Sequence, residues 1–179
     1  MTTQTAPAAS LTEIKPTNRA ILLIDVAGSL KITRQLGDAR AYHCLRFLTE
    51  TIKSAGSNKG RVIRSLGDGF LLAFDSVEDA LSHAVTAQSE VARCNPTEVP
   101  FKIRCGIHHG SVIEADGDMF GVAVYLASRV TGYAQGGEIL LTGEALEQCE
   151  RDTQLFKDFG PTLLPGFEEP VRLYEYRWA

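Results

Sequence analysis

Segment 20–26 places the strongest constraint on the fold, because it is a short apolar run, Ala-Ile-Leu-Leu-Ile-Asp-Val, whose one charge is Asp25. Such a run is typical of a strand that is buried on both faces. Segments 61–66 and 70–74 are two further apolar runs, and Gly-Asp-Gly separates them. This arrangement predicts a β-hairpin with Asp68 at its tip.

Helical patterns alternate with these strands. Asp38 can cap one helix, and Ser76, followed by Asp79 three positions later, can cap another. A third apolar pattern with helical spacing runs over 120–130. Further strands are predicted at 101–107, 138–141 and 173–178. The order strand, helix, hairpin, helix, strand, helix, strand predicts an α+β fold, a ferredoxin-like mixed sheet covered by helices.

The chain has 179 residues, which suits one domain. We expect residues 1–17 to form a flexible N-terminal tail and residues 18–179 to form the domain. A net charge of -4 does not indicate a protein that binds nucleic acid, because such proteins carry a basic surface. No apolar run approaches the roughly 20 residues of a membrane span, and no signal peptide is apparent. The four cysteines form no C-x-x-C pair, so we expect reduced thiols in a cytoplasmic protein.

Asp25 and Asp68 are the candidate metal ligands. A carboxylate within an apolar strand is costly unless it is paired or bound to a cation, although an aspartate at a strand end also accepts backbone hydrogen bonds. An Asp-Gly pair suits a tight turn for its own sake. If the first strand lies beside the hairpin, both carboxylates reach one edge of the sheet, where they can hold two Mg²⁺ or Mn²⁺ ions about 4 Å apart. Such a pair would neutralise a triphosphate during phosphoryl transfer.

Asp118, Tyr125 and Arg129 form a second candidate set. Offsets of seven and four would put them on one polar stripe of a helix. A solvated helix face is the alternative interpretation. Gly117 and Gly121 flank Asp118 and leave backbone room for a ligand or partner chain. The guanidinium of Arg129 suits phosphate oxygens.

Several segments in this order resemble the catalytic domain of the class III adenylate and guanylate cyclases. The resemblance covers about 19–178. The segments are Leu-Ile-Asp-Val-Ala-Gly-Ser at 23–29 with Gln-Leu-Gly-Asp at 35–38, Arg-Ser-Leu-Gly-Asp-Gly-Phe at 64–70, Arg-Cys-Gly-Ile-His-His-Gly at 104–110, Gly-Asp-Met-Phe-Gly at 117–121 through Ala-Ser-Arg at 127–129, and Leu-Pro-Gly-Phe-Glu-Glu-Pro-Val at 164–171 with Leu-Tyr at 173–174.

The resemblance implies roles for these residues. Asp25 and Asp68 would be the ligands of two Mg²⁺ or Mn²⁺ ions, and Asp118 with Arg64 would select the purine. Arg129 would stabilise the transition state at phosphorus. The site would lie at the interface of a homodimer, and the reaction would convert ATP, in preference to GTP, to the 3′,5′-cyclic nucleotide and pyrophosphate.

The sequence departs from the family pattern at three positions. The family has Lys at Arg64, Asn at Tyr125 and often Asp at Val122, so the metal-binding half is retained and the substrate-binding half is altered. Tyr125 donates one hydrogen bond but is bulkier than Asn. One alternative is therefore a degenerate cyclase homology domain that binds nucleotide or a partner without turnover. Another is a diguanylate cyclase or polymerase palm, but the Gly-Gly-Asp/Glu-Glu-Phe turn of the diguanylate cyclases is missing.

Overall fold

The structure is a computed structural model that describes residues 15–55, 59–94, 96 and 99–179. It contains a sheet of eight strands, together with helices, and it confirms the predicted α+β class. The strands are β1 (Thr17–Val26), β2 (Gly60–Ser65), β3 (Gly69–Phe74), β4 (Ile103–Ala115), β5 (Asp118–Phe120), β6 (Ile139–Thr142), β7 (Phe156–Thr162) and β8 (Val171–Tyr176). The helices are α1 (Ser29–Leu36), α2 (Asp38–Ala55), α3 (Val77–Arg93), α4 (Val122–Tyr133), the single turn α5 (Gly143–Leu146) and the 3₁₀ turn η1 (Thr153–Leu155).

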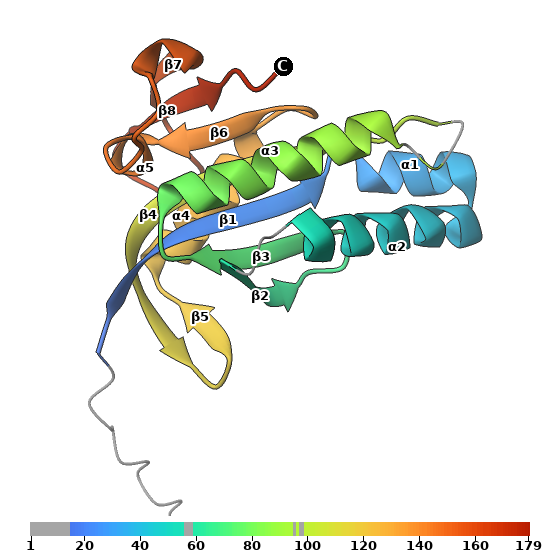
Figure 1. Ribbon diagram of the computed structural model, residues 1–179, viewed down its shortest axis with the longest axis horizontal. Helices are drawn as coiled ribbons and strands as arrows, with labels where there is room; N and C mark the ends of the chain where they lie inside the picture. Colours follow the sequence, from blue (N-terminus) through green and yellow to red (C-terminus); the bar gives the residue numbers. More distant parts are fainter. Residues whose placement is uncertain (1–14, 56–58, 95, 97–98) are drawn as a thin grey trace, which may run out of the picture.

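The strand order is β2-β3-β1-β4-β6-β8-β7, and β5 pairs with β4 off this path. β4 and β6 run parallel while the other pairs are antiparallel, so the sheet is mixed, as predicted. The first four main strands lie in the order β2-β3-β1-β4, which is the ferredoxin-like arrangement. This topology puts β1 between the hairpin that carries Asp68 and the long strand β4 (Figure 1).

Successive residues of β1 point to opposite faces of the sheet, as the pleat requires. Leu22 and Ile24 belong to the core cluster that α2 and α3 cover, whereas Ile21 and Leu23 belong to the cluster beneath α4. Figure 1 shows α2 and α3 on one side of the sheet. Full burial of each such side chain contributes about 1.5–3 kcal/mol. Cover on both faces explains why 20–26 is apolar without alternation.

Local signals explain some helix boundaries and not others. The hydroxyl of Ser76 accepts a hydrogen bond from the backbone N–H of Asp79 at 3.1 Å, so α3 has the cap that the sequence predicts. Helix α1 was not predicted. It follows Gly28, which has φ 70°, it has no side-chain cap, and only Ile32 and Leu36 pack against the core, each partly buried.

Helix α4 rests almost directly on the backbone of β4. A Cβ atom at Gly106 would lie 2.4 Å from Thr131 Oγ1 and 2.9 Å from the carbonyl oxygen of Ala127. Only glycine therefore allows the helix to approach this strand so closely.

Two predictions about residues 118–130 are wrong. Asp118 lies on β5, which pairs with the end of β4, and not on a helix with Tyr125 and Arg129. Helix α4 begins at Val122 after Gly121, and not at residue 120 as the apolar pattern predicts; Phe120 ends β5 and is 52% exposed. Strand β7 was not predicted.

The predicted tail lies mostly outside the described residues, and Thr17 is already the first residue of β1. Among the described helices, none is both long and apolar enough to cross a membrane.

Candidate active site

The fold brings Asp25 and Asp68 to the same edge of the sheet. Asp25 lies near the end of β1, opposite Gly69 of β3 on one side and Arg104 of β4 on the other. Asp68 lies in the turn between β2 and β3, and its carbonyl oxygen accepts a hydrogen bond from the backbone N–H of Val26 at 3.3 Å. The turn is thereby fixed beside the end of β1, which is the condition under which both carboxylates reach one edge of the sheet.

Both carboxylates line one open cavity of about 680 Å³. The N-terminal end of α1 lines the same cavity and adds the side chains of Lys31 and Arg34. The N-terminus of a helix favours anions, because its backbone N–H groups are unpaired and its dipole is positive there. The cavity thus combines two carboxylates for a cation with positive charge for a phosphate.

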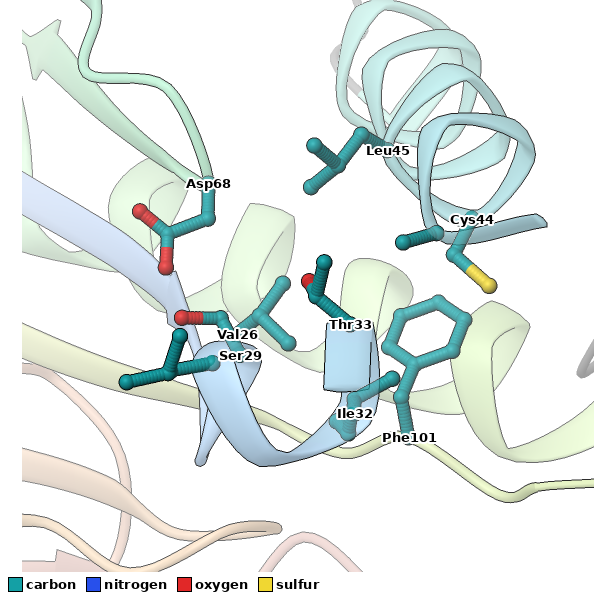
Figure 2. Close-up of a pocket in the computed structure, with 10 residues that line it drawn as sticks. Val26, Ser29, Ile32, Thr33, Cys44, Leu45, Asp68 and Phe101 are labelled. Atoms are coloured by element: carbon teal, nitrogen blue, oxygen red, sulfur yellow. The ribbon is translucent and has the colours of Figure 1, made fainter. Parts of the chain in front are cut away.

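A smaller cavity of about 280 Å³ adjoins it and is lined mostly by apolar side chains of α1 and α2. Figure 2 shows Asp68 reaching this space from the β2–β3 turn, together with Thr33 of α1 and Leu45 of α2. Asp68, Val26 and Ser29 line both cavities. Apolar packing beneath α1 therefore extends to the edge of the carboxylate site.

Arg104 is the immediate neighbour of Asp25. Its Nε and Nη2 donate hydrogen bonds to Asp25 Oδ2 at 3.0 and 2.6 Å. Its Nη1 donates to the carbonyl oxygen of Gly132, in the last turn of α4, at 3.0 Å. The two side chains of the ion pair are about a quarter exposed. Arg104 therefore links the candidate metal ligand to the helix that carries Tyr125 and Arg129.

The donor set at this edge fits a hard divalent cation. Within the described part of the chain, no three or more His, Cys, Asp or Glu side chains are grouped to hold a metal. Asp25 and Asp68 would bind such an ion, and water and substrate oxygens would complete its coordination. Mg²⁺ commonly binds in this way, through one or two carboxylates plus phosphates. The residues present therefore fit Mg²⁺ or Mn²⁺.

Arg64 and Asp118 meet on a neighbouring part of the sheet. Arg64 Nε and Nη2 donate to Asp118 Oδ1 at 3.0 and 2.6 Å, and the backbone N–H of Met119 donates to the same oxygen at 2.8 Å. The Met119 N–H and the Arg64 guanidinium hold the pKa of Asp118 below its usual value. The carboxylate is therefore charged at neutral pH. All the hydrogen bonds that it accepts from the described residues end on Oδ1, which leaves Oδ2 open.

Tyr125 and Arg129 lie on the exposed face of α4. With Val122 and Tyr133 they follow spacings of three and four residues, so they form one stripe along the helix. Val122 is 69% exposed and Tyr125 is 67% exposed. Arg129 Nε donates to the carbonyl oxygen of Pro165 at 3.0 Å. Among the residues that the structure describes, no hydrogen bond or ion pair joins Tyr125 or Arg129 to Asp25 or Asp68.

Sequence reasoning did not assign Arg104, Lys31 or Arg34 to the site. In segment 101–107 apolar residues alternate with Lys102 and Arg104, and this alternation was the available signal that Arg104 lies on the polar face of its strand. Its pairing with Asp25 joins positions 79 residues apart, so the register of β1 and β4 was needed to find it.

The sequence model of the adenylate and guanylate cyclase catalytic domain matches residues 13–175. A protein of Rhizobium meliloti (strain 1021) is 27% identical over 164 residues, which cover 88% of this chain and 28% of that protein. An adenylate cyclase of Streptomyces coelicolor is 29% identical over 133 residues, covering 74% of this chain and 34% of that protein. The chain thus spans about a third or less of these relatives.

Solved cyclase structures share the fold. An adenylate cyclase structure from Trypanosoma brucei, described in its monomeric state, has a TM-score of 0.76 at 20% identity and covers 90% of each chain. The guanylate cyclase domain of RhGC from Catenaria anguillulae, in complex with GTP, has a TM-score of 0.73 at 14% identity and covers 89% of this chain and 95% of that one. With the family model matching most of its length, the chain belongs to the adenylate and guanylate cyclase catalytic domain family.

Proposed function

We propose that this domain is a nucleotidyl cyclase that converts ATP to 3′,5′-cyclic AMP and pyrophosphate in cyclic-nucleotide signalling. The observation that carries the proposal is the shared cavity of Asp25 and Asp68 beside the N-terminus of α1. The ribose 3′-oxygen forms a bond to the α-phosphorus, the bond from that phosphorus to the bridging oxygen breaks, pyrophosphate leaves, and the hydroxyl proton passes to solvent. No covalent enzyme intermediate is needed, so positioning and charge stabilisation are the main requirements.

One set of side chains serves the polyphosphate end of the substrate. Asp25 and Asp68 would hold two Mg²⁺ or Mn²⁺ ions. Such ions would supply positive charge that neutralises the polyphosphate and lowers the pKa of the 3′-hydroxyl. Lys31 and Arg34 add positive charge on the α1 side of the cavity.

The Arg64–Asp118 pair recognises the purine. Asp118 Oδ2 is an available acceptor, and the guanidinium is a donor beside it. Together they match the donor and acceptor groups on a purine edge. We infer a preference for ATP over GTP because two similar proteins are named adenylate cyclase.

The working unit is a homodimer with sites at the interface. The apolar, exposed stripe on α4 supports this proposal, because a second copy would cover Val122 and Tyr125. Arg129, on the same stripe, then reaches the α-phosphate held by the other copy. We place the protein in the cytoplasm, where nucleoside triphosphates occur and where cysteines without disulfides remain reduced.

The test is a turnover assay on purified protein with ATP and GTP, each with Mg²⁺ and Mn²⁺. We expect cyclic AMP from wild type and at least about a hundredfold less from Asp25→Asn. Asp75→Asn is the matched control, since Asp75 follows β3 at the opposite end from Gly69 and pairs with Arg19. Absence of cyclic product from both nucleotides with both metals would contradict the proposal.

Tyr125 favours a second candidate, a cyclase homology domain that binds nucleotide without turnover. Its ring is bulkier than the asparagine of the family pattern and faces the proposed interface. The discriminating variant is Tyr125→Asn, with Tyr133→Asn as the control on the same stripe. A rise in product of about tenfold or more with Tyr125→Asn alone would identify the tyrosine as the block. Rapid turnover by wild type would exclude this candidate.

A further inference from the structure

Each of the three guanidinium nitrogens of Arg104 donates a hydrogen bond. Two of them bind a single carboxylate oxygen, Asp25 Oδ2, and the third binds the Gly132 carbonyl on α4. Arg104 and Asp25 also face each other directly in the β1–β4 register. The guanidinium is therefore held firmly against one side of the carboxylate.

The other carboxylate oxygen is left open. Asp25 Oδ1 accepts no hydrogen bond from the residues that the structure describes, and it faces Gly69 on the neighbouring strand. A Cβ atom at Gly69 would lie 3.4 Å from it. Arg104 thus turns the carboxylate so that Oδ1 is directed toward the strand that follows the Asp68 turn, and glycine keeps this side clear.

We propose that Arg104 is the resident counter-ion of Asp25 and keeps the affinity of the nucleotide-free site for divalent cations low. The inference rests on the proposed function in taking Asp25 as a metal ligand. A cation bound through Oδ1 shares its carboxylate with a guanidinium at hydrogen-bonding distance from Oδ2. The repulsion between these two positive groups, at the effective dielectric of a protein surface, is large enough to lower the affinity about tenfold or more.

This arrangement makes metal and nucleotide bind together. The triphosphate brings negative charge into the same cavity and offsets the repulsion that Arg104 imposes on the cation. The free protein therefore binds the metal weakly, whereas metal and nucleotide favour each other's binding. Arg104 acts here as a positioning residue, because it works through Asp25.

The experiment measures Mn²⁺ binding to the purified full chain without nucleotide, using the electron paramagnetic resonance signal of free Mn²⁺. The variants are Arg104→Gln, which removes the charge, and Arg104→Lys, which keeps the charge but loses the fork. Arg172→Gln is the matched control, because Arg172 forms a comparable pair with Asp158 across two other strands of the sheet. Asp25→Asn reports how much of the binding uses this carboxylate.

We expect Arg104→Gln to bind Mn²⁺ at least about tenfold more tightly than wild type. Arg104→Lys should stay within about threefold of wild type, and Arg172→Gln should match it. Asp25→Asn should bind weakly with or without Arg104. Circular dichroism checks that each variant is folded, and Arg104→Met, which retains the apolar stem, replaces Arg104→Gln if that variant unfolds.

Equal or weaker Mn²⁺ binding by the charge-removing variant would overturn the inference, and so would an equal gain in Arg104→Lys. A cyclase assay on wild type separates this outcome from failure of the proposed function. If wild type makes cyclic product and Arg104→Gln has an unchanged Mn²⁺ affinity, the counter-ion role is contradicted and the proposed function is not. Tighter binding in Arg104→Gln without any product from wild type supports the counter-ion role and contradicts turnover.

Discussion

Arg64 donates two hydrogen bonds to one oxygen of Asp118 and so joins β2 to β5 across 54 residues of sequence. The pair is preassembled within one chain, and the ring of Phe120 lies against the guanidinium, 5.9 Å from its carbon. The proposed purine pocket therefore does not need the nucleotide to bring its two polar groups together.

Asp118→Asn is expected to raise the KM for ATP by about tenfold or more, because hydrogen bonds that involve a charged group are stronger than neutral ones. Steady-state kinetics with Mn²⁺ measure the effect. Asp116→Asn, in the same turn, is the control and should keep the wild-type KM, since Asp116 is exposed and asparagine tolerates its φ of 52°. An unchanged KM in Asp118→Asn would remove this residue from the pocket.

Asp68→Asn is expected to lower turnover by about a hundredfold or more and to leave the free energy of unfolding nearly unchanged. Asparagine suits the turn as well as aspartate does but lacks the charge that a metal ligand requires. Turnover at saturating Mn²⁺ and urea unfolding measure the two effects. A loss of stability in step with the loss of activity would show that Asp68 serves the fold.

Gly106→Ala is expected to destabilise the protein by about 1–3 kcal/mol, because the new methyl group would push α4 away from β4. Gly132→Ala is the matched change in the helix itself. No atom lies within 4 Å of a Cβ there, so the free energy of unfolding should rise by about 0.5–1 kcal/mol. Urea unfolding of both variants checks the prediction, and effects of the same sign would contradict it.

His83 is expected to make stability dependent on pH. The residue is 5% exposed, neither ring nitrogen has a hydrogen-bond partner among the described residues, and burial lowers its pKa from 6.5 to about 4. Between these two pKa values His83 binds a proton in the unfolded chain and stays neutral in the folded chain. The free energy of unfolding should therefore fall by about 3 kcal/mol as the pH drops from 6.5 to 4, and should be unaffected by this group above that range.

His83→Leu removes the titrating group and keeps a similar volume. Urea unfolding of wild type and His83→Leu at several pH values between 4 and 7.5 isolates the contribution of His83, because other groups titrate in both proteins. If the free energy of unfolding depends on pH in the same way in the two proteins, His83 has the same pKa in the folded and the unfolded chain, and the prediction is wrong.

The strongest sequence signals predicted the elements that position the site. The apolar run of β1, the Gly-Asp-Gly turn and the Ser76 cap are local features, and the structure confirms all three. Helix α1 escaped prediction because it is short, has no side-chain N-cap and buries Ile32 and Leu36 only in part. Asp118 was assigned to a helix because the apolar spacing of α4 continues past Gly121, where the backbone turns into β5. The Arg104–Asp25 and Arg64–Asp118 pairs depend on strand register, which a single sequence does not specify.

The bare contact between Gly106 and α4 has a practical consequence for protein engineering. Because the strand contributes no side chain at this contact, no residue of β4 can be exchanged for a smaller one to bring the helix closer. The outward positions Val122, Tyr125 and Tyr133 therefore lie at a fixed distance from the sheet and can be varied as a set. This face of α4 is the natural place for a library that seeks a different strength of association between two copies, with the Arg64–Asp118 pair and the strand beneath the helix left untouched.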